Sequence, residues 1–362
     1  MSPATPTTLP WWTWTWPALA WAFMLVSVIF GVGAISSLVA GAILMATVFA
    51  AVYHAEVVAH RVGEPFGTLV LAVAVTVIEV ALIISVMLSA PEAKAGLARD
   101  TVFAATMIVC NGIVGLSLLS GGVRHHIQGF QLEGANAALA VLAALTTLTL
   151  VLPNFTSSVQ GPQFSTSQLA FAGVISLVLY GAFVFVQTVR HRDFFLPVDG
   201  GAEDSHAPPP SRQIAMASFG LLIVALVAVV GLAKLLTPSV EHVLKVLNVP
   251  REFIGIVIAA LVLLPEGLAA LRAARANRLQ TSLNLALGSA LASIGLTIPV
   301  VATIAIAMSL PIQLGLNAKD QVMLALTVLL GVITLGTGRT TVLQGIVHLV
   351  MFAAFLFFAI VP

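Results

Sequence analysis

The chain has 362 residues, of which 59% are hydrophobic and only 8% are charged, and its mean hydropathy is +1.09. Soluble globular domains carry about 25% charged residues, so this composition excludes that class and indicates a polytopic helical membrane protein. The formal net charge of +1 gives no basic surface of the kind that binds nucleic acid. The single cysteine, Cys110, excludes an intrachain disulfide and a thiolate metal cluster.

Apolar runs long enough to cross a bilayer occur eleven times along the chain. They predict transmembrane helices over residues 16–33, 35–53, 67–89, 101–120, 135–152, 168–189, 213–236, 252–272, 281–309, 320–338 and 341–360. Four tryptophans lie before residue 17, and they are typical of interfacial anchors of the first helix rather than of a cleaved leader.

A polar segment over residues 190–212 separates the sixth predicted helix from the seventh. Its charges, its glycines and its three consecutive prolines predict a mobile linker. When loops are assigned to alternate sides, nine Lys and Arg residues share the side of the N-terminus and the linker, against six on the other side. The positive-inside rule therefore predicts a cytoplasmic N-terminus and linker and an external C-terminus. We expect a multi-pass protein of the cell (inner) membrane.

The parts before and after the linker share a pattern. Glu79 lies midway along residues 67–89, and Glu266 is the only carboxylate within residues 254–272. If the first helix is peripheral, five helices remain on each side of the linker, and an odd number turns the second repeat upside down. We therefore expect an all-α fold of one peripheral helix plus two inverted five-helix repeats. The predicted division is an N-terminal segment with the first helix (1–34), a first repeat (35–189), a cytoplasmic linker (190–212) and a second repeat (213–362).

The helix after each glutamate helix carries a second shared pattern. Thr106 is followed four positions later by Cys110, and Ser289 is followed four positions later by Ser293. A glycine stands two positions after each of these pairs. Because positions i and i+4 share one face of a helix, each half has a polar stripe that could line a site.

A carboxylate at the depth of Glu79 or Glu266 is costly in a membrane and indicates a functional site. Our hypothesis is that the two meet near the midplane and share one site for a cation or for protons. A bound divalent cation and two bound protons each leave the pair neutral. Only these neutral states should cross the low-dielectric membrane at little cost, which makes exchange obligatory. The alternative for each glutamate is a structural hydrogen bond between helices. Oxygen ligands suit calcium and similar hard ions, and Pro265 with Gly267 predicts a helix break that frees carbonyls. The first half has no proline at the corresponding place, so Thr76 would have to provide the helix break there.

Other polar residues have less specific interpretations. Thr106 and Ser289 are either cation ligands or partners of their own helix backbone. Asn111 and Ser293 are candidates for supporting those ligands, whereas Cys110 suits packing and His348 suits a satisfied structural histidine. Charged and histidine residues just before the first glutamate helix form either an ion-attracting vestibule or, preferably, a solvated loop. These are His54, Glu56, His60, Arg61 and Glu64.

Two long stretches resemble the signature repeats of bacterial calcium/proton antiporters, in the cation/proton exchanger branch of the calcium:cation antiporter superfamily. They are GEPFGTLVLAVAVTVIEV (63–80) and LLPEGLAALRAARANRLQTSLNLALGSALASIGLTIPVV (263–301). The stretches VQTVRHRDFF and TGRTTVLQGIVHLVMFAAFL are similar to that group as well. The resemblance implies that Glu79 and Glu266 bind the transported cation and protons, that Thr106 and Ser289 match hydroxyl positions, and that there are eleven helices. A Gly-Asn pair usual in the family is missing, because Thr76 and Val77, or Leu263 and Leu264, stand there instead.

The resemblance implies a cation/proton antiporter that exports Ca2+ from the cytoplasm. Na+/H+ or K+/H+ exchange is the alternative, and a passive cation channel is a further one. An intramembrane enzyme is disfavoured, because no Gly-x-Ser-x-Gly or HExxH motif occurs. The expected partners are the transported cations, protons and membrane lipid, with no cofactor and no nucleic acid. The sequence leaves the oligomeric state open.

Overall fold

The computed structural model describes residues 9–31, 33–63, 66–88, 92, 94–196, 209–246, 249–250 and 252–361. Within these ranges, eleven helices are long and apolar enough to cross a membrane. Each of the eleven overlaps one of the predicted segments, so the chain is an all-α polytopic membrane protein, as the hydropathy pattern predicted.

The chain folds into two compact units, and each unit combines segments from both sides of the linker. Unit 1 comprises Met1–Ser89 and Gly201–Arg251, and unit 2 comprises Ala90–Gly200 and Glu252–Pro362. These units group the chain differently from the two predicted repeats. The repeat boundaries at residues 35, 189 and 213 therefore stay a prediction.

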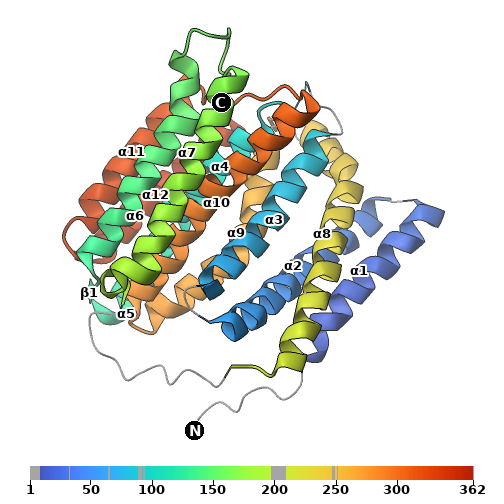
Figure 1. Ribbon diagram of the computed structural model, residues 1–362, viewed down its shortest axis with the longest axis horizontal. Helices are drawn as coiled ribbons and strands as arrows, with labels where there is room; N and C mark the ends of the chain where they lie inside the picture. Colours follow the sequence, from blue (N-terminus) through green and yellow to red (C-terminus); the bar gives the residue numbers. More distant parts are fainter. Residues whose placement is uncertain are drawn as a thin grey trace. The chain divides into compact units, whose positions relative to one another are not determined.

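The described residues of unit 1 form four helices. They are α1 (Trp11–Phe30), α2 (Ala34–Val62), α3 (Phe66–Met87) and α8 (Arg212–Val246). The helices α2 and α8 pack along each other, and α1 and α3 each contact both of them (Figure 1). A hydrogen bond of 2.7 Å between the hydroxyls of Ser37 and Ser239 joins α2 to α8. Much of α1 is exposed, including Trp11 and Trp14 near its start, which agrees with an interfacial position for these rings.

Unit 2 contains the remaining helices. The α-helices are α4 (Leu97–Met107), α5 (Val114–His125), α6 (Leu132–Thr146), α7 (Thr166–Phe185), α9 (Phe253–Arg275), α10 (Leu279–Met308), α11 (Ala318–Leu335) and α12 (Val342–Ile360). Shorter elements are η1 (Ile108–Ile113), η2 (Thr147–Val151), η3 (Leu152–Phe155), η4 (Val186–Arg190) and η5 (Arg192–Phe195). A π-helical η1 joins α4 to α5. In the apolar stretch of the resulting span, Leu97–His125, 89% of the residues are buried, a larger share than in the other spans, so this span forms the core of unit 2.

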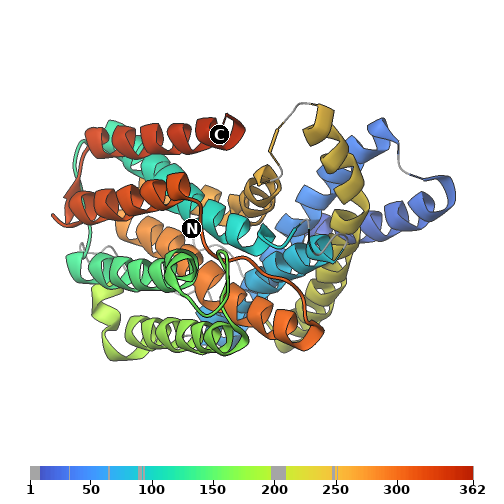
Figure 2. The ribbon, with the colours of Figure 1, turned by 90° about the horizontal axis from the view of Figure 1, so that it is seen from above.

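In unit 2, two helices from before the linker each pack along a helix from after it, an arrangement that we call the reciprocal pairing. Helix α12 lies along α5, and α7 lies along α10 (Figure 2). Small residues bring these pairs together: a methyl group added at Gly345 of α12 would overlap the backbone of Leu119, and one added at Gly295 of α10 would lie 2.5 Å from Tyr180 Cβ. Van der Waals packing of this closeness is the main force between helices in lipid.

Local sequence sets where several helices of unit 2 begin. Ser165 and Gln168 form a capping box at the start of α7, and Thr341 and Gln344 form one at the start of α12. At the start of α11, the side chain of Asn317 accepts a hydrogen bond of 2.8 Å from the backbone N–H of Asp320.

The helix ends of unit 2 form two polar faces. On the Asp100 face, named for the residue at the start of α4, Arg99 donates to the carbonyl of Gly315 at 3.1 Å. On the Arg275 face, named for the residue at the end of α9, Gln128 donates to the carbonyl of Ala274 at 2.9 Å. There β1 (Gln128–Gly129) also pairs in antiparallel fashion with β2 (Arg339–Thr340), so helices that are distant in sequence are joined at one membrane face.

The predicted linker starts later than the sequence indicated. Residues 192–195 form η5 shortly after η4, and Phe195 is buried. The Phe195 ring packs edge-on against Phe183 of α7 with a centroid distance of 5.8 Å, because an aromatic side chain gains packing by leaving the polar segment. Residues 197–208 of the predicted linker lie outside the described residues.

Candidate cation site

Glu79 lies in α3 as the only ionisable residue of that helix. Its side chain is buried, with 3% exposed, and Thr76 is buried three positions earlier, with 5% exposed. Residues three apart lie on one face of a helix, so α3 presents a carboxylate and a hydroxyl together. The helix continues without interruption from Phe66 to Met87, so there is no break at Thr76 that would expose backbone carbonyls.

Glu266 lies in α9, directly after Pro265, and its Oε2 atom is buried. The predicted break at Pro265 and Gly267 is wrong, because α9 runs continuously from Phe253 to Arg275. Proline has no N–H, so the carbonyl four residues earlier, at Leu261, still loses its usual helical donor. One local carbonyl, rather than a broken helix, is what the proline makes available.

The turn of α9 that carries Glu266 lies against η1. A methyl group added at Gly267 would lie 3.1 Å from Ile113 Cδ1, so the side chain of Ile113 occupies the space beside this glycine. Helix α9 also packs against α4, α5 and α10 in the same unit. The predicted ligands that follow each glutamate in sequence therefore lie on helices that surround α9.

Thr106 lies in the last turn of α4 and is fully buried, and its hydroxyl donates to the carbonyl of Val102 at 3.0 Å. This is the backbone interaction that the sequence left open as an alternative. Its oxygen lone pairs are not consumed by donating this hydrogen, so a ligand role is compatible with the bond.

The polar stripe expected after Thr106 is changed by η1. The backbone N–H of Val114 bonds to the carbonyl of Val109, five residues earlier, which is the π-helical spacing. Cys110 lies inside this segment, so α-helical i, i+4 spacing does not relate it to Thr106. In α10 the helix is continuous, and Ser289 and Ser293 keep that spacing. Ser293 is buried and Ser289 is half-buried.

Asn111 lies in η1 and is held by residues of α11 and α12. Its Nδ2 donates to Thr327 Oγ1 at 2.8 Å, and its Oδ1 lies 3.2 Å from His348 Nδ1. The other ring nitrogen, Nε2 of His348, lies 3.1 Å from Thr334 Oγ1. His348 is therefore satisfied at both nitrogens, as the sequence interpretation expected, but the group it supports is Asn111, which sequence reasoning did not connect to it.

The predicted vestibule lies on a helix rather than in a loop. Helix α2 continues to Val62, so His54, Glu56, His60 and Arg61 belong to its last turns. His54 is buried, with Nε2 lying 3.1 Å from the carbonyl oxygen of Thr13 in α1, whereas Glu56 is exposed. Glu64 lies outside the described residues. The loop interpretation is wrong because the apolar residues among these charges extend the helix by more than two turns.

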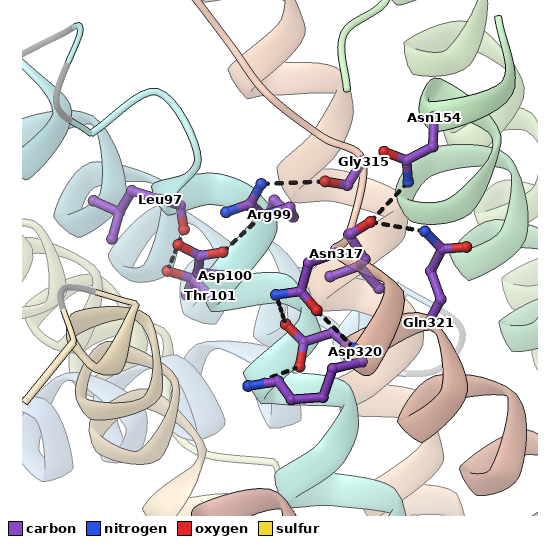
Figure 3. A network of polar contacts seen from close by, with 11 residues as sticks. Leu97, Arg99, Asp100, Thr101, Asn154, Gly315, Asn317, Asp320 and Gln321 are labelled. Atoms are coloured by element: carbon purple, nitrogen blue, oxygen red, sulfur yellow. Dashed lines mark hydrogen bonds and ion pairs between the residues drawn. The ribbon is translucent and has the colours of Figure 1, made fainter. Parts of the chain in front are cut away.

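The Asp100 face carries a polar network that the sequence analysis missed (Figure 3). Arg99 forms an ion pair of 2.7 Å with Asp100 and also reaches the α10–α11 connection through Gly315. In that connection, Asn317 Nδ2 donates to Asp320 Oδ2 at 2.8 Å. The one sequence signal for it was the Asn-x-x-Asp spacing, which is typical of a helix start.

The candidate residues are divided between the two units. Glu79 and Thr76 belong to unit 1, whereas Glu266, Thr106, Asn111, Ser289 and Ser293 belong to unit 2. Among the described residues, no group of three or more His, Cys, Asp and Glu side chains could hold a metal ion. Carboxylate and hydroxyl oxygens, which these residues offer, are donor types that hard cations prefer. That the two glutamates share one site stays a prediction.

Residues 19–189 and 217–361 match the family described as sodium/calcium exchanger protein. The "Putative ionic transporter y4hA" of Sinorhizobium fredii (strain NBRC 101917 / NGR234) is 49% identical over 360 residues, which is 98% of this chain and 97% of that protein. The sodium-potassium/proton antiporter ChaA of Escherichia coli (strain K12) is 38% identical over 316 residues, which is 86% of this chain and 85% of that protein. A crystal structure of a selenium-substituted Ca2+/H+ antiporter, YfkE, has a TM-score of 0.74 at 16% identity and covers 97% of this chain and 99% of that chain, which is a likeness of fold.

Proposed function

Since this chain belongs to the sodium/calcium exchanger protein family, we propose that it is a secondary active cation/proton antiporter of the cell (inner) membrane. The observation that carries the proposal is the burial of Glu79 in α3, a helix with no other ionisable residue. Within a membrane, such a carboxylate needs a positive partner or a proton, and a transported ion supplies the first while the proton gradient supplies the second.

Glu79 and Glu266 bind either the cation or protons in this mechanism. When a divalent cation is bound, its two charges cancel the two carboxylates, and when the cation leaves, two protons do the same. Both neutral states cross from one access state to the other more cheaply than the empty, doubly charged state. Exchange rather than leak follows from this charge balance, and no cofactor takes part.

Hydroxyl oxygens complete the proposed site. Thr76 lies on the same face of α3 as Glu79. Thr106 and Ser289 lie on helices that pack around α9. Asn111 and Ser293 support these ligands from positions further along α4–η1–α5 and α10. Each half then contributes one carboxylate and one or two hydroxyls, which suits ions that prefer oxygen.

Two inverted five-helix repeats, over residues 35–189 and 213–362, supply the alternating access, with α1 peripheral. The reciprocal pairing in unit 2 supports this division. The third helical span of the first repeat, Leu97–His125, packs against the last helix of the second repeat, α12. In return, the third helix of the second repeat, α10, packs against the last span of the first, which starts with α7. A two-fold relation between repeats produces such an exchange of partners.

Arginine distribution supports a cytoplasmic N-terminus and linker. On the Arg275 face of unit 2 lie Arg124, Arg190, Arg192, Arg272, Arg275, Arg278 and Arg339. The Asp100 face carries fewer basic residues, among them Arg99 and Lys319, together with the carboxylates of Asp100, Glu252 and Asp320, which interact electrostatically with one another. Under the positive-inside rule, the Arg275 face is cytoplasmic, and the C-terminus, one helix further on, is external.

Calcium is the first candidate for the cation, because two carboxylates match a divalent charge and hydroxyl and carbonyl oxygens suit calcium. Export from the cytoplasm then uses the inward proton gradient. Exchange of Na+ or K+ for protons is the second candidate, and it is favoured by the 38% identity to the sodium-potassium/proton antiporter ChaA. If the cation is monovalent, charge balance requires either that one carboxylate keeps a proton or that another monovalent ion binds to it.

Glu56, exposed near the end of α2, attracts cations to the cytoplasmic entrance. Glu64, which lies outside the described residues, is the second candidate for this role. The substitution Glu56→Gln should raise the cation concentration for half-maximal exchange at low salt and leave the maximal rate unchanged. An equal effect at high salt would contradict an electrostatic role, because salt screens exposed charges.

Exchange in proteoliposomes tests the function. Purified protein is reconstituted with a pH-sensitive dye inside, and Ca2+, Na+ or K+ is added outside at several pH values. In an antiporter, cations that enter the lumen drive protons out, so the lumen becomes more alkaline. The ion that causes this change is the cargo. Cation movement without proton movement would support a passive channel instead, and neither movement would reject transport of these ions.

A further inference from the structure

The buried cluster of His348, Asn111, Thr334 and Thr327 lies beside the proposed site and has no part in the charge balance there. His348 of α12 is 1% exposed, and Asn111 of η1 is fully buried. A polar cluster this deep in an apolar bundle is costly unless each member is satisfied, so its geometry carries information about its role.

The hydrogen-bond roles in the cluster follow from its contacts. Asn111 Nδ2 donates to Thr327, so its Oδ1 is the atom that faces His348 and can only accept. His348 Nδ1 must therefore donate across the 3.2 Å contact, and in the neutral ring Nε2 accepts from Thr334. Thr327 can pass its own hydrogen to the carbonyl of Met323 at 2.8 Å. One tautomer of one histidine satisfies the whole cluster.

This cluster fixes the segment where the helix departs from α-helical geometry. A π-helical turn shifts the backbone hydrogen-bond register, which is unfavourable unless other contacts hold it. In η1 those contacts come from Asn111, which bonds to Thr327 and His348. Helix α12 is itself held close, because a methyl group added at Gly115 would lie 3.1 Å from His348 Cβ and from the backbone nitrogen of Leu349.

The same turn carries the contact to the glutamate helix. Ile113, two residues after Asn111, fills the space at Gly267, and Gly267 follows Glu266. A return of η1 to α-helical spacing would rotate Ile113 and the residues after it, and it would move the surface on which the Glu266 turn rests. The path from His348 to Glu266 is thus short, and it runs through Asn111, Ile113 and Gly267.

We propose that His348 is a positioning residue for the cation site: by donating to Asn111 it holds η1 in its π-helical form and so sets the position of the Glu266 turn. The inference rests on the proposed function. It assigns to the last helix of the chain an influence on cation affinity, although His348 itself does not touch the cation. Hydrogen-bonding partners behind metal ligands commonly change metal affinity by about 10- to 100-fold.

Three variants separate the link to Asn111 from the rest of the cluster. His348→Leu removes both contacts, whereas His348→Asn can replace the donor at the Nδ1 position. Thr334→Val removes only the far contact, at nearly constant volume. Cation binding is measured without transport, as protection of Glu266 by Ca2+, and by Na+ in parallel, against dicyclohexylcarbodiimide, with the labelled peptide quantified by mass spectrometry.

We expect the protecting cation concentration to rise about tenfold in His348→Leu and by less than about twofold in His348→Asn and Thr334→Val. Hydrogen exchange should also become faster for the amides of residues 108–114 in His348→Leu only. Equal shifts in His348→Leu and Thr334→Val would overturn the proposal, as would wild-type protection in His348→Leu. If His348→Leu does not fold, Thr327→Val, which removes the second partner of Asn111, takes its place with the same criteria.

The outcome for the wild-type protein separates the two proposals. If Ca2+ and Na+ both fail to protect wild-type Glu266, and K+ fails in the same assay, the proposed cation site is wrong. If the wild type is protected and the His348 variants bind as tightly, the antiporter proposal stands and the positioning role is rejected.

Discussion

Asn284 Nδ2 donates a hydrogen bond of 2.7 Å to the carbonyl of Phe195 and so ties the segment after α7 to helix α10. Asn284 also accepts from Gln280 at 2.9 Å, and Gln280 in turn accepts from the backbone N–H of Gln131 at 2.6 Å. This chain of contacts crosses the Arg275 face from the start of α6 to η5. It places the end of the first half of the chain on the helix that carries Ser289 and Ser293.

Substitutions at this contact should loosen η5. Phe195→Ala removes a buried ring, and we expect it to lower the free energy of unfolding by about 3 kcal/mol. Asn284→Asp keeps the size of the side chain but removes the donor, for a loss of about 1–3 kcal/mol. Thermal unfolding in detergent measures both. Phe171→Ala, in an exposed position of α7, and Gln213→Glu, exposed in α8, are the controls. If Phe195→Ala and Asn284→Asp lower the free energy of unfolding by no more than these controls do, docking of η5 is contradicted.

Neutral substitutions at the two glutamates test the site. Glu79→Gln and Glu266→Gln each remove one of the charges that must be cancelled, so we expect cation/proton exchange in proteoliposomes to fall at least about 100-fold, with normal expression. Glu133→Gln, exposed in the first turn of α6, should exchange like the wild type. Wild-type exchange in either glutamine variant would remove that residue from the site.

The pH dependence reports how many protons compete with one cation. Protons and cations bind the same carboxylates, so lowering the pH raises the cation concentration needed for half-maximal exchange. Mass action gives about a 100-fold rise per pH unit if two carboxylates act as one pair and about tenfold if only one is involved. The measurement is initial exchange rate at fixed membrane potential between pH 6 and pH 9. An affinity that is independent of pH would contradict competition at shared groups.

Close helix contacts make a pair of glycine substitutions informative. A methyl group added at Gly255 of α9 would lie 2.8 Å from the backbone of Asp100 and Thr101, whereas one added at Gly181 of α7 meets nothing within 4 Å. We therefore expect Gly255→Ala to lower the free energy of unfolding by about 1–3 kcal/mol. Gly181→Ala should raise it by about 0.5–1 kcal/mol, because alanine favours helix. Thermal unfolding measures both, and equal behaviour of the two variants would show that α9 does not pack this closely on α4.

The family resemblance found in the sequence is confirmed, because the match to the sodium/calcium exchanger family extends over nearly the whole chain. The helix count could be predicted for a simple reason. Spanning a bilayer requires about 20 apolar residues in succession, and that requirement is local. The depth of Glu79 could be read in the same way, since it follows from its distance to both ends of an apolar run.

Two local expectations were wrong because a helix can continue through a proline and through a segment with several charged residues. Pro265 does not break α9, since neighbouring helices hold the helix together around one missing hydrogen bond. The charged residues from His54 to Arg61 do not form a loop, since the backbone of α2 gains hydrogen bonds by continuing to Val62.

By itself, the sequence determined the class of protein, the positions of the membrane spans and the two isolated carboxylates. Each of these depends on residues that are close together in the chain. Only the tertiary structure decided that η1 is π-helical, that Asn111 binds Thr327 and His348, and that Phe195 leaves the linker for α10. These features join segments separated by 89 to 237 residues, and a buried polar group is satisfied by whichever partner the packing brings near it.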